Sequence, residues 1–121
     1  MTSQSETPSN ETILLRQDEG GIATLTLNRP DKFNALSTEL MGRIQGELDS
    51  LVDDKSIRVV VIAGNGKAFC AGHDLKEMND DPGQEAIEAL FDQCSRMMVS
   101  LTKIPQPVIA RVHGMATAAG C

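Results

Sequence analysis

Two stretches of small residues could bring main-chain groups close to a ligand. The first, G-N-G-K-A-F-C-A-G-H-D at residues 64–74, follows the apolar run V-V-V-I-A, and the second, H-G-M-A-T-A-A-G-C at residues 113–121, follows P-V-I-A-R-V. Small residues let a substrate carbonyl approach the main chain, and a helix N-terminus directs unpaired N–H groups at developing negative charge. The chemistry that fits is stabilisation of an oxyanion by two main-chain donors, one from each stretch.

A phosphate-binding loop is a second interpretation, because glycines after a strand often cradle phosphates. The spacing argues against it. Phe69 stands where the dinucleotide fingerprint has its third glycine, and Lys67 is followed by Ala68 rather than by the Ser or Thr of a Walker motif.

A metal site is a third interpretation, with Cys70 and His73 in C-x-x-H and with His113 and Cys121 as later ligands. Two loosely spaced pairs are not the closer and fuller set of a zinc framework, so we expect no metal. The fourth interpretation is structural: both stretches are tight connections, Cys70 is a small core residue and His113 is a surface residue. From the residues alone, the oxyanion site and the structural interpretation stay open.

The elements that must position these stretches alternate between strands and helices. Periodicity and turn residues predict, in chain order, strands at Ile13–Arg16 and Ile22–Leu27 joined by D-E-G-G, a helix capped by Ser37 that runs to about Asp53, a strand at Val59–Ala63, a helix that starts from D-D-P-G at Asp81 and ends before Pro105, and a strand from Pro107 to Val112. The continuously apolar run at Val59–Ala63 predicts a central strand covered on both faces. The order favours an α/β sheet.

Composition narrows the function classes. Asp and Glu outnumber Lys and Arg by 17 to 11, giving net charge −6, and Trp and Tyr are absent, so we expect no nucleic-acid partner. No run of apolar residues is long enough to cross a membrane. Three cysteines without a paired pattern suggest free thiols in a reducing compartment, and residues 1–11 lack the features of a signal or transit peptide. We therefore expect a disordered polar tail at 1–11, one domain at 12–121, and a cytoplasmic location.

Three motifs carry a family resemblance. L-N-R-P-D-K-F-N-A-L-S, F-C-A-G-H-D-L-K-E-M and P-V-I-A-R-V-H-G-M-A-T-A-A-G-C occur in order within residues 25–121, and together they resemble the enoyl-CoA hydratase/isomerase (crotonase) superfamily. The resemblance implies an α/β fold, the crotonase-like spiral of ββα units, of which this chain holds the N-terminal half. It also implies a homotrimer or a dimer of trimers.

The resemblance implies an acyl-CoA thioester as the substrate and no separate cofactor. By position in the motifs, the two oxyanion donors would be the main-chain N–H groups of His73 and Ala119, and losing one such donor typically costs about 3 kcal/mol. The helix begun by Asp74 would lie behind the first donor. We interpret the His73 side chain as a bystander.

The resemblance also implies where coenzyme A lies. Its nucleotide end would follow the A-G-x-D-L loop and the loop after the first hairpin. The residues expected to contact it are Lys32, Phe33, Ala71, His73, Asp74, Leu75 and Lys76, with Lys32 and Lys76 as partners for phosphate. For each lysine alone, a solvated surface role is an equal alternative.

The chain departs from the family pattern at two places. A-A-G-C stands where many members have G-G-G-C, so Ala118 and Ala119 must adopt conformations that suit glycine better. In hydratases of the family a glutamate follows this cysteine and a second lies further along, and both would fall beyond Cys121. We therefore expect a fragment of a longer protein, inactive by itself.

The function that the resemblance favours for the parent protein is hydration of a 2-enoyl-CoA. Isomerases and thioester hydrolases of the same superfamily are alternatives, and the acids that would distinguish them lie outside the sequence. A non-catalytic CoA-binding or assembly protein is an alternative of a different class.

Overall fold

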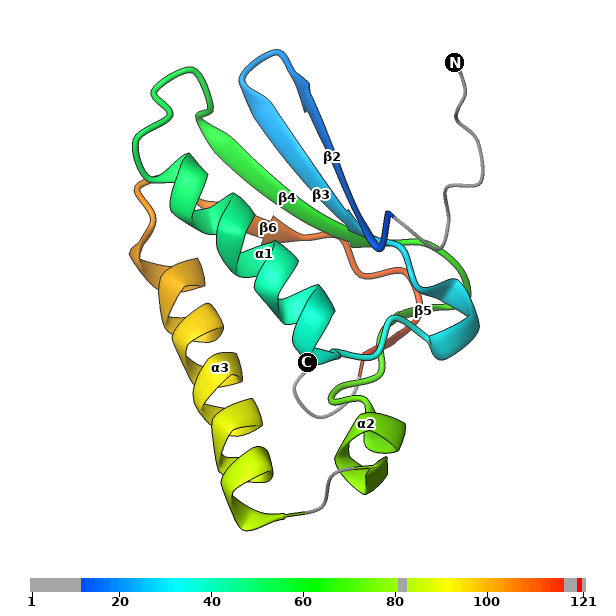
Figure 1. Cartoon of the computed structure of the whole chain (residues 1–121). Helices are drawn as coiled ribbons and strands as arrows, with labels where there is room; N and C mark the ends of the chain where they lie inside the picture. Colours follow the sequence, from blue (N-terminus) through cyan, green and yellow to red (C-terminus); the bar gives the residue numbers. More distant parts are fainter. Residues whose placement is uncertain (1–11, 81–82, 117–119, 121) are drawn as a thin grey trace.

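The computed structural model describes residues 12–80, 83–116 and 120. The tail predicted at residues 1–11 lies outside this part of the chain, and so do Ala118, Ala119 and Cys121. The described residues form a mixed α/β structure in which two long helices lie side by side along one face of a sheet (Figure 1).

The main sheet has four strands in the order β2-β3-β4-β6. β2 (Leu14–Glu19) and β3 (Ile22–Leu27) form the predicted antiparallel hairpin. Gly20 and Gly21 form the two-residue turn of this hairpin, with φ of 61° and 82°. Such a turn needs positive φ at both residues, which glycine adopts readily. Because these two glycines suffice, β2 continues through Asp18 and Glu19, which were predicted to lie in the turn.

β4 (Val59–Gly64) occupies the predicted central position, parallel to β3 on one side and to β6 (Val108–Ala110) on the other. Two sequence expectations were too strong. Only Val60 and Ala63 of β4 are buried, so its faces are partly covered in this chain, and β6 ends at Ala110 rather than at Val112. β6 is an edge strand here, and Ile109 in it is 54% exposed.

Helix α1 (Thr38–Leu51) begins where the cap residue predicts, because the Ser37 hydroxyl accepts a hydrogen bond from the N–H of Leu40 at 3.1 Å. Its apolar stripe is buried and consists of Leu40, Met41, Ile44, Leu48 and Leu51. Each such aliphatic side chain contributes about 1.5–3 kcal/mol through removal from water. α1 thus anchors the loop that precedes it.

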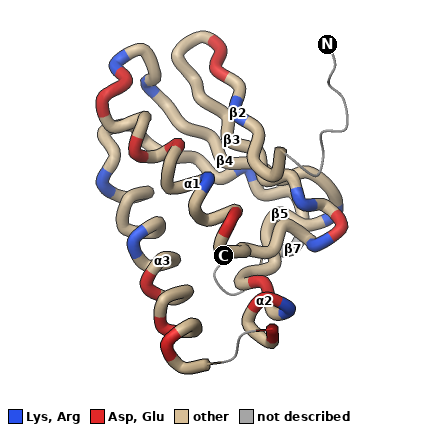
Figure 2. Tube along the Cα trace, in the orientation of Figure 1, with Lys and Arg blue, Asp and Glu red and all other residues tan. Residues whose placement is uncertain are grey.

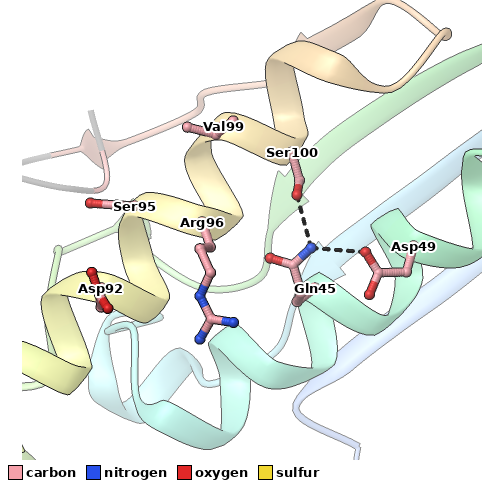
Figure 3. Close-up of a pocket in the computed structure, with 7 residues that line it drawn as sticks. All are labelled: Gln45, Asp49, Asp92, Ser95, Arg96, Val99 and Ser100. Atoms are coloured by element: carbon pink, nitrogen blue, oxygen red, sulfur yellow. Dashed lines mark hydrogen bonds between the residues drawn. The ribbon is translucent and has the colours of Figure 1, made fainter.

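Helix α3 (Gln84–Lys103) starts after Gly83 and lies against α1. At the polar edge of this contact the Gln45 amide of α1 donates to the hydroxyl of Ser100 in α3 and to Asp49, each at 2.9 Å (Figure 3). Arg96 and Asp92 line the same surface groove.

Two short strands were not predicted. β5 (Ala68–Cys70) and β7 (Met115–Ala116) pair in parallel as a separate two-stranded sheet, although both segments had been interpreted as turns. A 3-10 turn (Pro30–Lys32) precedes α1, and helix α2 (Leu75–Asp80) follows β5 after a short loop (Figure 1). β5 and β7 join the two small-residue stretches, which supports the expectation that these stretches work together.

Candidate oxyanion site

The first small-residue stretch is held by the main chain of Leu36. The Leu36 N–H donates to the Gly72 carbonyl at 2.7 Å, and the Asp74 N–H donates to the Leu36 carbonyl at 3.0 Å. These two bonds form a parallel bridge centred on His73. In such a bridge the central residue directs its own N–H away from the partner. Among the described residues no main-chain carbonyl accepts from the His73 N–H, so this donor faces away from Leu36 and stays available.

Asn34 fixes the loop that carries Leu36. It is fully buried and has φ of 54°, in the left-handed region that Asn tolerates better than most residues. Its side-chain oxygen accepts from the Arg29 N–H at 2.7 Å, and its amide nitrogen donates to the carbonyls of Asn65 and Ala68, each at 2.9 Å. Asn34 therefore joins the loop after β3 to the connection between β4 and β5. Sequence reasoning missed this role, and the only signal was an Asn in a polar loop.

Arg29 and Asp74 connect the same two segments by charge. The Arg29 guanidinium lies 2.9 Å from the Asp74 carboxylate, and the side chains are only 17% and 14% exposed. Arg29 also donates to the carbonyl of Ala35, and the other Asp74 oxygen accepts from the N–H groups of Lys76 and Glu77 at 3.1 and 3.2 Å. Asp74 therefore caps α2, as expected from the sequence, and its partner Arg29 had not been predicted.

The Asp74 carboxyl group is held in its charged form. Burial alone would raise the pKa of Asp74, but the hydrogen bond from Arg29 and those from the main-chain N–H groups of Glu77 and Lys76 outweigh it. The pKa of Asp74 consequently lies below its usual value. The carboxylate is fully engaged in the protein and has little capacity left for a ligand.

The second small-residue stretch lies against the first. A Cβ atom on Gly114 would overlap the carbonyl of Lys67, and one on Gly120 would overlap the carbonyl of Cys70. Glycine is required at both positions because the two backbones touch. Ala119, the second predicted donor, lies outside the described residues, and its role stays a prediction.

The His73 side chain points toward helix α3. Its ring contacts Phe91 edge to face, with ring centroids 4.9 Å apart and an interplanar angle of 87°. Its Nδ1 is buried without a hydrogen-bond partner among the described residues. The imidazole thus packs against an aromatic side chain of α3, and its role as a bystander stays a prediction.

Three of the residues expected to contact coenzyme A surround one hollow. A cavity of about 420 Å³ is lined by Arg29, Lys32, Asp74, Lys76, Glu77 and Asp80. Arg29 pairs with Asp74, and Lys76 lies 3.4 Å from Asp80. Of these six residues, Lys32 keeps an ammonium group without an ion pair. Figure 2 shows the basic residues of the loop after β3 and of the start of α2 on the same side of the molecule.

The other predicted contact residues, Phe33, Ala71, His73 and Leu75, do not line this hollow. Phe33 and Leu75 are 49% and 70% exposed, and the Phe33 carbonyl accepts from the Ala71 N–H at 3.0 Å. The loop after β3 and the A-G-H-D turn are thus joined through their main chains, as a shared binding surface requires.

A second cavity, apolar and of about 230 Å³, lies next to β5. Cys70 and Gly120, from the two small-residue stretches, are among its lining residues. The other lining residues come from the sheet, from α1 and α3 and from the segments next to them: Leu27, Leu36, Ile44, Ile62, Phe69, Met97, Met98, Leu101, Val108 and Ala110. An apolar group could be accommodated there next to the small-residue turn.

The cysteines of the described segments are free thiols. Cys70 and Cys94 are buried and form no disulfide, and burial raises the pKa of both thiols. Such thiols are poor nucleophiles and poor metal ligands at neutral pH. Residues 12–80, 83–116 and 120 place no group of three or more His, Cys, Asp or Glu side chains to hold a metal ion. No helix in this part of the chain is long and apolar enough to span a membrane.

The chain belongs to the enoyl-CoA hydratase/isomerase family, whose model matches residues 17–121. It is 39% identical over 109 residues to the mitochondrial enoyl-CoA hydratase domain-containing protein 3 of Xenopus laevis, covering 90% of this chain and 37% of that protein. It is 36% identical to the 1,2-epoxyphenylacetyl-CoA isomerase of Escherichia coli, covering 89% of this chain and 42% of that enzyme.

Solved structures agree with this assignment. The crystal structure of an enoyl-CoA hydratase of Mycobacterium smegmatis superimposes with a TM-score of 0.89 at 54% identity, covering 92% of this chain and 44% of that one. The structure described here therefore has the fold of the N-terminal part of a crotonase. The chain spans less than half the length of these relatives.

Proposed function

We propose that the intact protein is an enoyl-CoA hydratase, which adds water across the double bond of a 2-enoyl-CoA to give the 3-hydroxyacyl-CoA. The single observation that carries the oxyanion chemistry of this proposal is the His73 N–H, which the bridge to Leu36 turns outward from a turn built of small residues. Family membership adds independent support.

In this proposal the His73 N–H binds the thioester oxygen. When the water oxygen bonds to C3, the electron pair of the double bond moves toward the carbonyl and an enolate forms. Negative charge collects on the thioester oxygen, and a fixed N–H donor stabilises it more than it stabilises the neutral carbonyl. The N–H of Ala119 would be the second donor. Protonation at C2 then completes the addition, and the acid–base groups for both proton transfers would lie beyond Cys121.

Coenzyme A would occupy the hollow at Lys32 and Lys76, with its phosphates near the free ammonium group of Lys32. The acyl chain would extend toward the apolar cavity that reaches Cys70 and Gly120. One cavity is lined by charged residues and the other mainly by apolar ones, which suits a ligand with a charged end and an apolar end.

Double-bond isomerisation is the second candidate, and the specific observation in its favour is the similarity to the E. coli 1,2-epoxyphenylacetyl-CoA isomerase. An isomerase would use the same oxyanion donors and would move a proton without adding water. A hydratase and an isomerase would differ in their acid–base groups, so the identity of residue 122 in the intact protein would help to distinguish the two activities. A glutamate there would favour hydration.

The test is to incubate the intact protein with a short 2-enoyl-CoA and with the corresponding 3-enoyl-CoA, to separate the thioesters by liquid chromatography, and to weigh each product by mass spectrometry. Gain of one water on the 2-enoyl-CoA supports the hydratase. Interconversion of the two enoyl thioesters without a mass change favours the isomerase. No product from either thioester contradicts both candidates.

A further inference from the structure

The main-chain direction of His73 is set by groups that lie outside the turn itself. The turn is short and contains Gly72, which has φ of 94°, so its own residues hold it only weakly. The two hydrogen bonds to Leu36 bracket His73, but they act only as long as the loop and the turn keep their register. Something must therefore resist sliding of one segment along the other.

Arg29 and Asp74 are suited to that task. Arg29 lies at the start of the loop and Asp74 directly follows His73, so their ion pair spans the two segments at the end of the bridge. Arg29 uses its second guanidinium nitrogen for the Ala35 carbonyl, next to Leu36. Asp74 uses its second oxygen for the N-terminus of α2. The two largely buried side chains thus make one ion pair with each other and three hydrogen bonds to the main chain, at Ala35, Lys76 and Glu77.

We infer that the Arg29–Asp74 ion pair is a positioning device that holds the His73 N–H in its outward direction, which makes Arg29 and Asp74 positioning residues for the reaction of this site. The inference rests on the proposed function for its catalytic consequence. Its structural part, the ordering of the A-G-H-D turn, stands on the contacts alone. The pair differs from an ordinary surface ion pair because each partner also fixes a main-chain group.

The chain provides a matched control. Arg43 and Glu39 form an ion pair on α1 with a separation of 3.7 Å, and these side chains are 48% and 67% exposed. Neither lines the candidate site. Arg43→Gln and Glu39→Gln therefore remove the same charges as Arg29→Gln and Asp74→Asn, at an exposed place outside the candidate site.

The experiment compares steady-state kinetics and amide hydrogen exchange of these four variants and of the double variant Arg29→Gln/Asp74→Asn in the intact protein. Arg29→Gln and Asp74→Asn should each lower kcat roughly 10- to 100-fold, with KM changed less than about three-fold, because a displaced donor fails mainly in the transition state. The double variant should lose little more than either single variant, since the pair acts as a unit. Exchange in peptides that cover residues 70–77 should rise in these three variants and stay unchanged in both controls.

Arg29→Lys separates positioning from simple misfolding. A lysine keeps the charge, but it cannot bond the carboxylate and the Ala35 carbonyl together as the guanidinium does, so we expect intermediate kcat and intermediate exchange. The inference is overturned if the site variants keep kcat within about two-fold of the parent, if their losses add in the double variant, or if exchange at residues 70–77 does not rise. If the parent turns over no acyl-CoA, the proposed function fails, and the exchange measurement still decides whether the pair orders the turn.

Discussion

Asn34 fixes the loop that carries Leu36, although its type and position in the sequence suggest only a loop. It combines a left-handed backbone with a fully buried amide that joins the loop after β3 to the connection between β4 and β5. His73 could be selected from the sequence because the A-G-H-D motif is local. Asn34 could not, because its partners Asn65 and Ala68 come from a distant part of the chain.

Replacing Asn34 by alanine should lower the free energy of unfolding by on the order of 2–4 kcal/mol, because the Asn65 and Ala68 carbonyls and the Arg29 N–H would lose a buried partner. Urea denaturation of the intact protein measures this. Asn79→Ala, at an exposed position of α2, is the control and should change the free energy by less than about 0.5 kcal/mol. Equal stability of the two variants would contradict the role assigned to Asn34.

At the scale of elements, the sequence predicts the helices and strands that have a clear hydrophobic period or a capping residue. It misses the short strands that form only by pairing with a distant segment. β3 and α1 follow their patterns almost to the residue, since alternation, Ser37 and the glycines of the first hairpin determine them locally. β5 and β7 have only three and two residues, too few for any period to appear. Their pairing depends on contact between two backbones far apart in the sequence.

Gly120→Ala should disturb that contact. The added methyl group has no room against the Cys70 carbonyl, so the second stretch must move away from the first, and kcat/KM of the intact protein should fall about ten-fold or more. Gly46→Ala in α1 is the matched control. Nothing lies within 4 Å of its new methyl group, and the change should raise stability by up to about 1 kcal/mol without lowering kcat/KM. Thermal unfolding and steady-state kinetics measure both, and an unaffected Gly120→Ala enzyme would argue against close apposition of the two stretches.

At the scale of the whole molecule, the polar contacts of Asn34, Arg29 and Asp74 join the loop after β3, the β4–β5 connection and α2 into one unit. The edge strand β6 exposes the apolar side chain of Ile109. The trimeric assembly implied by the resemblance stays a prediction. The chain spans less than half the length of its relatives.

Acid should weaken this unit through Asp74. Its pKa is lowered in the folded protein, so its contribution to stability is fully present above the ordinary Asp pKa of about 3.9 and is lost as the pH falls through the lower folded value. The free energy of unfolding should therefore decrease with falling pH below about pH 4, and Asp74→Asn should reduce that slope. Chemical denaturation at a series of acidic pH values measures this, with Glu39→Gln as the control. Identical slopes for Asp74→Asn and the parent would contradict the assignment.

The most direct test of the account is a crystal structure of the intact protein with a bound acyl-CoA or a non-reactive thioester analogue. The account predicts that the thioester oxygen lies about 2.7–3.1 Å from the main-chain nitrogen of His73, with a second main-chain donor from the segment around Ala119 on the same oxygen. A thioester carbonyl that points away from His73, while coenzyme A is fully bound, would contradict it.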